Sequence, residues 1–373
     1  MKGILWDGRA VEVCGERLTE IPFEPGLKRI APGLVDLQVN GFGGVDFNDS
    51  GIDFESYANA LRALYAHRVT CALPTFITNQ ASVLSAQLSR LEAFRQKAES
   101  RKDVSEPTER TGTEPEKLAS APYYHLEGPF ISPEEGYRGA HPLSDVLSTE
   151  DPQAERFLSE WQTAANGRIR LMTFSPHVGN PARFIAMLKS FGILASVGHT
   201  HATAAQIHDA VQAGAVLATH LGNACAQLLP RHANPIWAVL AEDALSVSMI
   251  GDCFHLPPEM LKVFYRVKGR EKTFLISDAT QYAGKEPGAY HTHIGGDVIL
   301  TPERKLHIAG SPNVLAGAAK SLWEGWKHVS ALGFASPEDC WYAASSAPLK
   351  FLTGKETDPE LTPMVCVDGD ENQ

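Results

Sequence analysis

The sequence predicts an α/β fold: a (β/α)8 barrel with a small β-sandwich domain built from the two ends of the chain. Along most of the 373 residues, short apolar runs of strand length alternate with segments of helical periodicity. Eight such runs can be counted, the strand number of this barrel. Several runs end in His, Glu or Asp, and a barrel would gather these ends at one mouth.

The predicted strands are the buried apolar runs, which begin at residues 34, 69, 123, 169, 193, 215, 245 and 273. Helical spacing separates them near residues 53–67, 81–98, 152–165, 182–191, 204–213, 236–242 and 258–267. A β hairpin over 285–312 and helices near 316–332 and 337–351 are expected to follow. This alternation assigns residues 31–352 to the barrel domain.

The two ends of the chain have a different character. Residues 1–30 contain short alternating segments, such as the run at 10–14, between Gly and Pro turns. A short β-like run at 363–367 follows the last predicted helix. Residues 1–30 and 353–373 are therefore predicted to form the small β domain.

Composition narrows the class of partner. The formal net charge is −11, which disfavours nucleic acid and anionic membranes because the long-range field repels phosphates. A phosphorylated small molecule stays compatible, since a local Arg or His can override the global sign. The six cysteines include no C-x-x-C pair, the start lacks a signal-peptide pattern, and no apolar run approaches the roughly 20 residues of a membrane helix. We expect a cytoplasmic chain with a small-molecule partner.

Two histidines stand at the ends of consecutive predicted strands. The run at 193–197 leads to His199 and the run at 215–219 leads to His220, with helix 204–213 between them. Two imidazoles that converge at a barrel mouth suit a divalent metal. The alternative is that each is a hydrogen-bonded core histidine.

Two carboxylates occupy equivalent places on other strands. Glu127 ends the strand that begins at 123, and Asp278 ends the strand that begins at 273. Two imidazoles and one carboxylate are the ligand set of a hydrolytic metal site with an open position for water. Asp278 is better placed as a base than as a fourth ligand. Taken alone, Glu127 also fits a rim ion pair, and Asp278 a helix N-cap.

An ordered set of motifs makes the chain resemble a known family. The motifs are His125-Leu-Glu127-Gly-Pro-Phe-Ile-Ser, Gly139-Ala-His141-Pro, Val197-Gly-His199-Thr, Ala218-Thr-His220-Leu-Gly-Asn223-Ala, Ser277-Asp278-Ala and Leu315-Ala-Gly-Ala-Ala-Lys-Ser-Leu322. They resemble those of N-acetylglucosamine-6-phosphate deacetylases, within the amidohydrolase superfamily. The similarity runs from about residue 31 to 352.

The resemblance implies a metal-dependent hydrolase. Glu127, His199 and His220 would hold the metal. Asp278 would activate water and protonate the amine, and His141 would help to polarise the acetamide carbonyl. The reaction implied is deacetylation of N-acetylglucosamine 6-phosphate to glucosamine 6-phosphate and acetate, in amino-sugar catabolism. On sequence alone, His141 also fits a solvent-exposed loop histidine.

The resemblance also implies a substrate site. Asn223, the Ala224 backbone and Arg231 would bind the sugar phosphate, and His255 would contact the sugar, as would His141. Arg231 has the bidentate donors that suit phosphate, although a plain surface arginine is the alternative. The family is usually dimeric, so a homodimer is expected in which the partner subunit can reach the phosphate.

The residues of the first predicted strand indicate how many metal ions the site holds. Many amidohydrolases carry His-x-His there for a second metal, whereas this chain has Gln38-Val-Asn40, and neutral amides are poor ligands beside imidazole. One divalent ion is expected, with Zn²⁺ first and Fe²⁺ or another ion open, because the ligand set suits several metals. His177 and His201 lie near strand ends but are left out of the metal set.

Departures from the family pattern leave the substrate open. Gly222 stands where the family usually has a bulky residue and Cys225 where it has a methionine, so a wider sugar pocket is expected. Ala318 replaces a serine that is often found in its motif. The alternatives are an amidohydrolase acting on a different N-acyl amino sugar or a cyclic amide, or a non-catalytic sugar-phosphate-binding paralogue.

Overall fold

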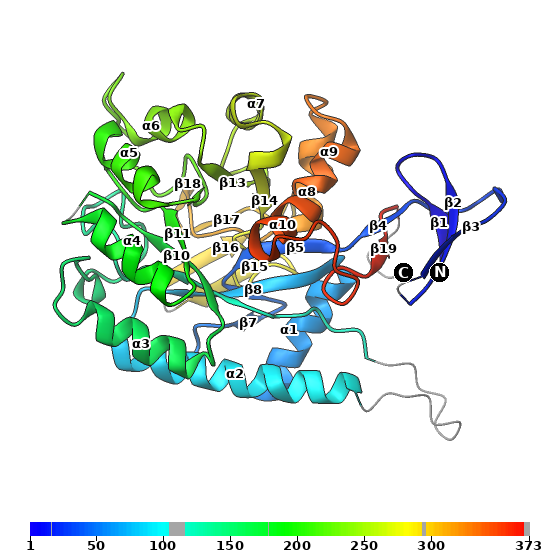
Figure 1. Ribbon diagram of the computed structural model, residues 1–373, viewed down its shortest axis with the longest axis horizontal. Coiled ribbons are helices and arrows are strands. Elements are labelled where there is room, and N and C mark those ends of the chain that lie inside the picture. The colour runs from blue at the N-terminus through cyan, green and yellow to red at the C-terminus, as the bar shows by residue number, and fades with distance from the viewer. Residues whose placement is uncertain (16, 104–115, 178, 293–295, 369–373) are drawn as a thin grey trace.

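An eight-stranded parallel sheet forms the centre of the molecule (Figure 1). A computed structural model describes residues 1–15, 17–103, 116–177, 179–292 and 296–368. The sheet has the order β14-β13-β12-β11-β10-β9-β8-β5. Its strands are β5 (Leu34–Val39), β8 (Val69–Ile77), β9 (Tyr124–Glu127), β10 (Ile169–Phe174), β11 (Leu194–Val197), β12 (Leu217–Ala218), β13 (Ser246–Ile250) and β14 (Thr273–Ile276). All eight predicted strands are confirmed.

The sheet closes into a barrel between β14 and β5. Val39, the last residue of β5, and Ala279, three residues beyond β14, form a parallel bridge. The backbone amide of Ser277 donates to the buried Asp36 carboxylate at 3.1 Å. The Asp36 side chain therefore joins β5 to the end of β14 at this seam, where the two strands form no continuous hydrogen-bonded ladder.

Helices follow the barrel strands and pack outside them (Figure 1). They are α1 (Phe54–Ala66), α2 (Ala81–Asp103), α3 (Ala154–Ala164), α4 (Pro181–Ser190), α5 (Ala204–Ala213), α6 (Pro235–Ala241), α7 (Pro258–Lys268), α8 (Leu322–Ala331), α9 (Pro337–Tyr342) and α10 (Ser346–Thr353), with short 3₁₀ turns η1 (Leu143–Asp145) and η2 (Arg270–Lys272). Local signals set several bounds: α5 begins with a capping box of Thr203 and Gln206 and ends at Gly214 in the left-handed region.

Two expected helices differ from the observed ones. The helix predicted at 316–332 begins only at residue 322, because Ser321 caps it and the preceding residues continue from a strand. The helix predicted at 337–351 is split into α9 and α10. The split occurs because the carbonyls of Ala343 and Ala344 accept hydrogen bonds from Leu275 and Val35 of the barrel instead of from helix amides.

Small antiparallel sheets complete the fold. β15 (Gly288–Thr292), β16 (Gly296–Leu300), β17 (Leu306–Ile308) and β18 (Ser311–Leu315) form a four-stranded sheet, which confirms and extends the expected hairpin. β1 (Lys2–Ile4), β2 (Ala10–Cys14) and β3 (Arg17–Glu20) form a sheet to one side of the barrel (Figure 1). β4 (Ile30–Pro32) pairs with β19 (Met364–Cys366), and β6 (Gly41–Phe42) with β7 (Val45–Asp46).

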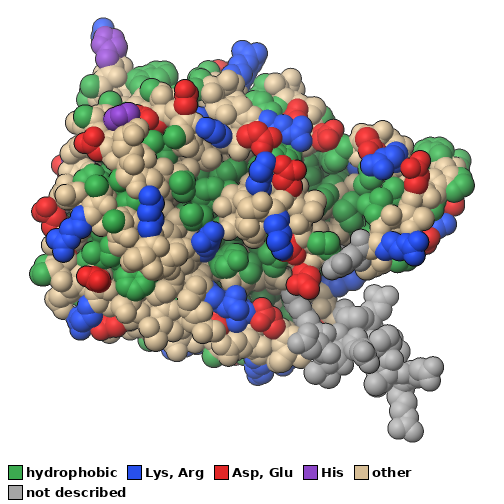
Figure 2. Space-filling model, in the orientation of Figure 1, with side chains coloured by type: hydrophobic (Ala, Val, Ile, Leu, Met, Phe, Trp, Pro, Cys, Tyr) green, Lys and Arg blue, Asp and Glu red, His purple; other side chains and the backbone are tan. Residues whose placement is uncertain are grey.

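The N-terminal and C-terminal segments thus meet through the pairing of β4 with β19. The division into a barrel domain of residues 31–352 and a small β domain stays a prediction, and residues 369–373 lie outside the described residues. Acidic and basic side chains are interspersed on the face shown in Figure 2. Among the described residues, no helix combines the length and apolar character needed to cross a membrane.

Candidate metal centre

The structure brings Glu127, His199 and His220 together at one end of the barrel. Glu127 is the last residue of β9, and each histidine lies two residues beyond its strand. The Glu127 Oε1 atom is 3.1 Å from His199 Nε2 and 2.7 Å from His220 Nε2. All three side chains are buried. Both histidines are buried and hydrogen-bonded, as the core-histidine alternative also expects, but they share Glu127 as their partner, and Glu127 is buried and not an exposed rim residue.

The backbone at these strand ends is unusual. His199, His220 and Asp278 have φ values of 48°, 31° and 49°, in the left-handed region that non-glycine residues rarely adopt. Such strain is of order 1–2 kcal/mol per residue and clusters at functional sites. Three residues at strand ends with a positive φ point to one shared constraint at this mouth.

The donor set fits a divalent cation. His199 Nδ1 is 3.0 Å from the Tyr137 carbonyl oxygen, which can only accept, so Nδ1 carries a proton and Nε2 of the neutral ring presents a lone pair. That lone pair faces the Glu127 carboxylate, and the two would repel each other without a cation or proton between them. When protons on the two Nε2 atoms take the place of the cation, burial still raises the pKa of Glu127, but the charge and hydrogen bonds of the protonated His199 and His220 rings outweigh it and hold that pKa well below its usual range.

Two amides of the first strand support the carboxylates. Gln38 Nε2 donates to Glu127 Oε1 at 2.8 Å, and Asn40 Nδ2 donates to Asp278 Oδ1 at 2.8 Å. Since a carboxylate accepts only, the orientation of each amide follows from its partner. The two amides fix the carboxylates through their NH₂ groups.

Asp278 lies beside the three donors but outside their hydrogen bonds. Burial raises the pKa of Asp278 to about 6, and the negative charge of Glu127 raises it further in the same direction. A carboxylate with a pKa near neutrality can both accept and return a proton. The N-cap alternative is wrong, because residues 279–287 contain a bridge and turns and no helix begins there.

His141 reaches the same place from the loop after β9. It is buried, so the alternative of a solvent-exposed loop histidine is wrong. Its Nε2 lies 3.7 Å from Glu127 Oε2, and ligand atoms of Glu127, His141 and His199 lie within 4.8 Å of one another. Burial lowers the pKa of His141 to about 3, with a further decrease from His199, so the ring is neutral.

The residues expected to bind substrate lie in the loops around this mouth. Asn223 Nδ2 donates to the His220 carbonyl at 3.2 Å, and Ala224 follows with a φ of 47°. His255 Nδ1 pairs with the buried Asp252 carboxylate at 2.7 Å. Arg231 is exposed, and in the described part of the chain no acidic side chain pairs with it.

His201 and His177 stay outside the metal group. His201 contacts Ser132 Oγ at 3.1 Å and Glu134 Oε1 at 3.3 Å, and its ring lies 4.0 Å from that of His177. These contacts connect His201 to the loop that carries His141.

The space beside Gly222 is occupied by apolar side chains, and the expected wider sugar pocket stays a prediction. A Cβ at this position would lie 2.9 Å from Leu256 Cδ2 and 3.1 Å from Met260 Cε. A larger residue would therefore require the ends of the Leu256 and Met260 side chains to shift. Glycine is required here also by its φ of +90°.

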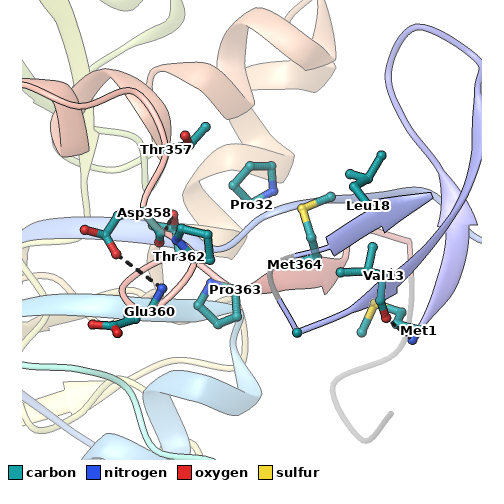
Figure 3. A pocket seen from close by; sticks show the side chains of 12 residues that line it. Met1, Val13, Leu18, Pro32, Thr357, Asp358, Glu360, Thr362, Pro363 and Met364 are labelled. Atoms are coloured by element: carbon teal, nitrogen blue, oxygen red, sulfur yellow. Dashed lines mark hydrogen bonds between the residues drawn. The ribbon is translucent and has the colours of Figure 1, made fainter. Parts of the chain in front are cut away.

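A separate cavity of about 600 Å³ lies far from this chemistry, between the N-terminal sheet and the C-terminal tail. Met1, Val13, Leu18 and Met364 line it (Figure 3). No histidine or cysteine is among its described lining residues, so it offers no comparable set of donors.

Sequence reasoning missed two supporting residues. Thr78, one position past β8, contacts His141, and Asp252, two positions past β13, contacts His255. Both are polar residues just after a strand, so the strand-end criterion that selected Glu127 and Asp278 would also have selected them.

The chain is similar to curated protein sequences and to solved structures. No family model matches the sequence. The N-acetylglucosamine-6-phosphate deacetylase of Bacillus subtilis is 30% identical over 331 residues, which cover 87% of this chain and 76% of the relative. The Bos taurus and Homo sapiens enzymes of the same name are each 30% identical, over 87% and 88% of this chain and 74% and 75% of theirs.

Solved structures show the same fold. The N-acetyl-D-glucosamine-6-phosphate deacetylase of Mycobacterium smegmatis has a TM-score of 0.76 at 24% identity and covers 92% of this chain and 86% of its own. The Thermotoga maritima enzyme has a TM-score of 0.76 at 22% identity, over 95% and 91%. The curated relatives show more than the fold, because their similarity spans most of both chains at 30% identity. The chain therefore belongs to the N-acetylglucosamine-6-phosphate deacetylase family, a family of metal-dependent hydrolases.

Proposed function

We propose that the protein hydrolyses N-acetylglucosamine 6-phosphate to glucosamine 6-phosphate and acetate, in amino-sugar catabolism. One observation carries this proposal: Glu127 Oε1 lies within 3.1 Å of both imidazole Nε2 atoms, with Asp278 beside them. The names of the relatives supply the substrate. A water-activating carboxylate would be superfluous in a protein that only binds sugar phosphates.

Glu127, His199 and His220 would hold one divalent ion, for which we propose Zn²⁺. When bound, the metal supplies Lewis acidity and lowers the pKa of water to about 7. The single ion is supported by Gln38 and Asn40, whose NH₂ groups point to the carboxylates and so present donors where a second ion would need lone pairs. Metal analysis of the purified protein distinguishes Zn²⁺ from Fe²⁺ and gives the number of ions per chain.

The residues around the ion have separate tasks in this proposal. Asp278 takes a proton from the attacking water and returns it to the amine nitrogen as the C–N bond breaks. Asn40 holds Asp278 through its Oδ1 atom. The neutral His141 ring lies beside Glu127 and His199, where it polarises the acetamide carbonyl and stabilises the developing oxyanion.

The sugar phosphate would be bound by the loop after β12. Arg231 is exposed without an acidic partner among the described residues, so its guanidinium is free for phosphate. Asn223, the Ala224 backbone and His255 would contact the sugar, with His255 held in place by Asp252.

An acetate-release assay tests the function directly. We expect acetate from N-acetylglucosamine 6-phosphate and far less from unphosphorylated N-acetylglucosamine, because Arg231 would have no phosphate to bind. Equal rates on both compounds would favour an amidohydrolase for another N-acyl amino sugar or a cyclic amide. Absence of acetate from metal-loaded protein would favour the non-catalytic paralogue.

We also propose a homodimer in the cytoplasm. Leu228 is 91% exposed in the same loop as Arg231, and Trp237 on α6 is 54% exposed, with Val263 and Val267 on one face of α7. Exposed apolar side chains gathered beside a functional loop favour contact with a second copy. All six cysteines are free thiols, which is compatible with a reducing compartment. Light scattering on a size-exclusion column gives the mass, and a monomer would refute the dimer.

A further inference from the structure

Thr78 contacts the ring of His141 with two groups at once. It follows β8 directly and is buried, with 1% of its surface exposed. Its backbone N–H donates to His141 Nδ1 at 3.3 Å, and its Oγ1 lies 2.8 Å from the same nitrogen. The space for this hydroxyl depends on Gly128, where an added Cβ would lie 2.2 Å from Thr78 Oγ1.

The backbone amide determines which ring nitrogen carries the proton. An amide N–H can only donate, so His141 Nδ1 must present its lone pair to Thr78. A neutral imidazole has one proton, which then stands on Nε2. The hydroxyl of Thr78 can donate to the same lone pair and so reinforce this arrangement.

We propose that Thr78 is a positioning residue that holds His141 as the Nε2–H tautomer, with a hydrogen-bond donor aimed at the acetamide carbonyl. This inference rests on the proposed function for the identity of the acceptor. It also explains why His141 is not a metal ligand, although its Nε2 lies close enough to Glu127 and His199 to form an alternative ligand set. A protonated Nε2 has no lone pair for a metal, whereas Nε2 of His199 has one.

The tautomer is measured by ¹⁵N NMR of histidine-labelled protein, with the His141 ring assigned from its loss in His141→Gln. We expect the chemical shift of a protonated Nε2 and of an unprotonated Nδ1. A protonated Nδ1 would overturn the proposal. This measurement needs no turnover, so it separates failure of the inference from failure of the proposed function.

Two pairs of variants test the role of the contact. Thr78→Val keeps the shape but loses the hydroxyl, and Thr78→Ser keeps the hydroxyl. We expect Thr78→Val to lower kcat roughly fivefold to tenfold, the loss of one hydrogen bond, with KM within about twofold and metal content unchanged. Thr78→Ser should stay near wild type.

The second pair replaces the ring itself. The amide of Gln ends near the place of Nε2, and that of Asn near Nδ1, so His141→Gln should retain more activity than His141→Asn if Nε2–H is the working donor. Wild-type kcat in Thr78→Val, loss of its metal, or greater activity of His141→Asn would each overturn the proposal.

Discussion

Replacing Asp278 with Asn removes the proposed proton acceptor and keeps the side chain in the same position. Asn40 Nδ2 donates to Asp278 Oδ1 at 2.8 Å, and the amide oxygen of an introduced Asn can accept the same hydrogen bond. The side chain therefore stays in place but can no longer accept a proton at neutral pH. The three proposed metal ligands are untouched, and Glu127 loses a like-charged neighbour.

The expected loss follows from the task assigned to Asp278. General acid–base catalysis by a positioned side chain contributes about 10²–10⁴ in rate, so kcat should fall by that factor. The change equals about 3–5 kcal/mol of transition-state free energy, because each tenfold corresponds to about 1.4 kcal/mol. KM should change far less, since Asp278 acts on the water and the leaving nitrogen and not on the sugar phosphate.

The assay compares acetate release at equal metal content, with metal per chain measured on the same samples. Asp209→Asn on the exposed face of α5 is the matched control, because it makes the same chemical change at a surface position and should keep wild-type activity. An Asp278→Asn variant with full metal and a kcat within about threefold of wild type would refute the assignment of the base.

Three further predictions concern the metal, the pocket and the barrel seam. Glu127→Ala should reduce bound metal from near one ion per chain to near zero in metal analysis, while His177→Ala should keep it. Gly222→Ala should lower stability by about 1–3 kcal/mol, because of its positive φ and because the ends of Leu256 and Met260 must shift, whereas Gly310→Ala, with a φ of +78° and nothing within 4 Å, should show only the backbone cost by thermal unfolding. Burial raises the pKa of Asp36 to about 7, so its contribution to stability is fully present below about pH 4 and is lost as pH rises through 7. The free energy of unfolding of the wild type, measured relative to Asp36→Asn, should therefore fall by about 3 kcal/mol between pH 5 and pH 8. The Tm of the wild type minus that of Asp36→Asn should fall over the same range. If this difference in Tm did not change with pH, the raised pKa of Asp36 would be contradicted.

The local pattern of the chain determined the elements of the barrel. Buried parallel strands need continuous apolar runs and helices need a 3.6-residue spacing, so both can be identified without knowledge of their neighbours. The same reasoning located Glu127, His199, His220 and Asp278, because strand-end positions of a barrel share one mouth whatever the details of packing. Arg231 was found only through the family resemblance.

Tertiary structure decided every property that depends on a distant partner. The proton on His141 depends on Thr78, 63 residues earlier, and the closed seam depends on Asp36 and Ser277, 241 residues apart. Only the packed fold shows that a side chain at Gly222 would face Leu256 and the apolar side of α7. Hydrophobic periodicity indicates which face of a helix or strand is buried. A hydrogen bond or a steric clash depends in addition on which atoms of distant residues lie against that face once the barrel has closed.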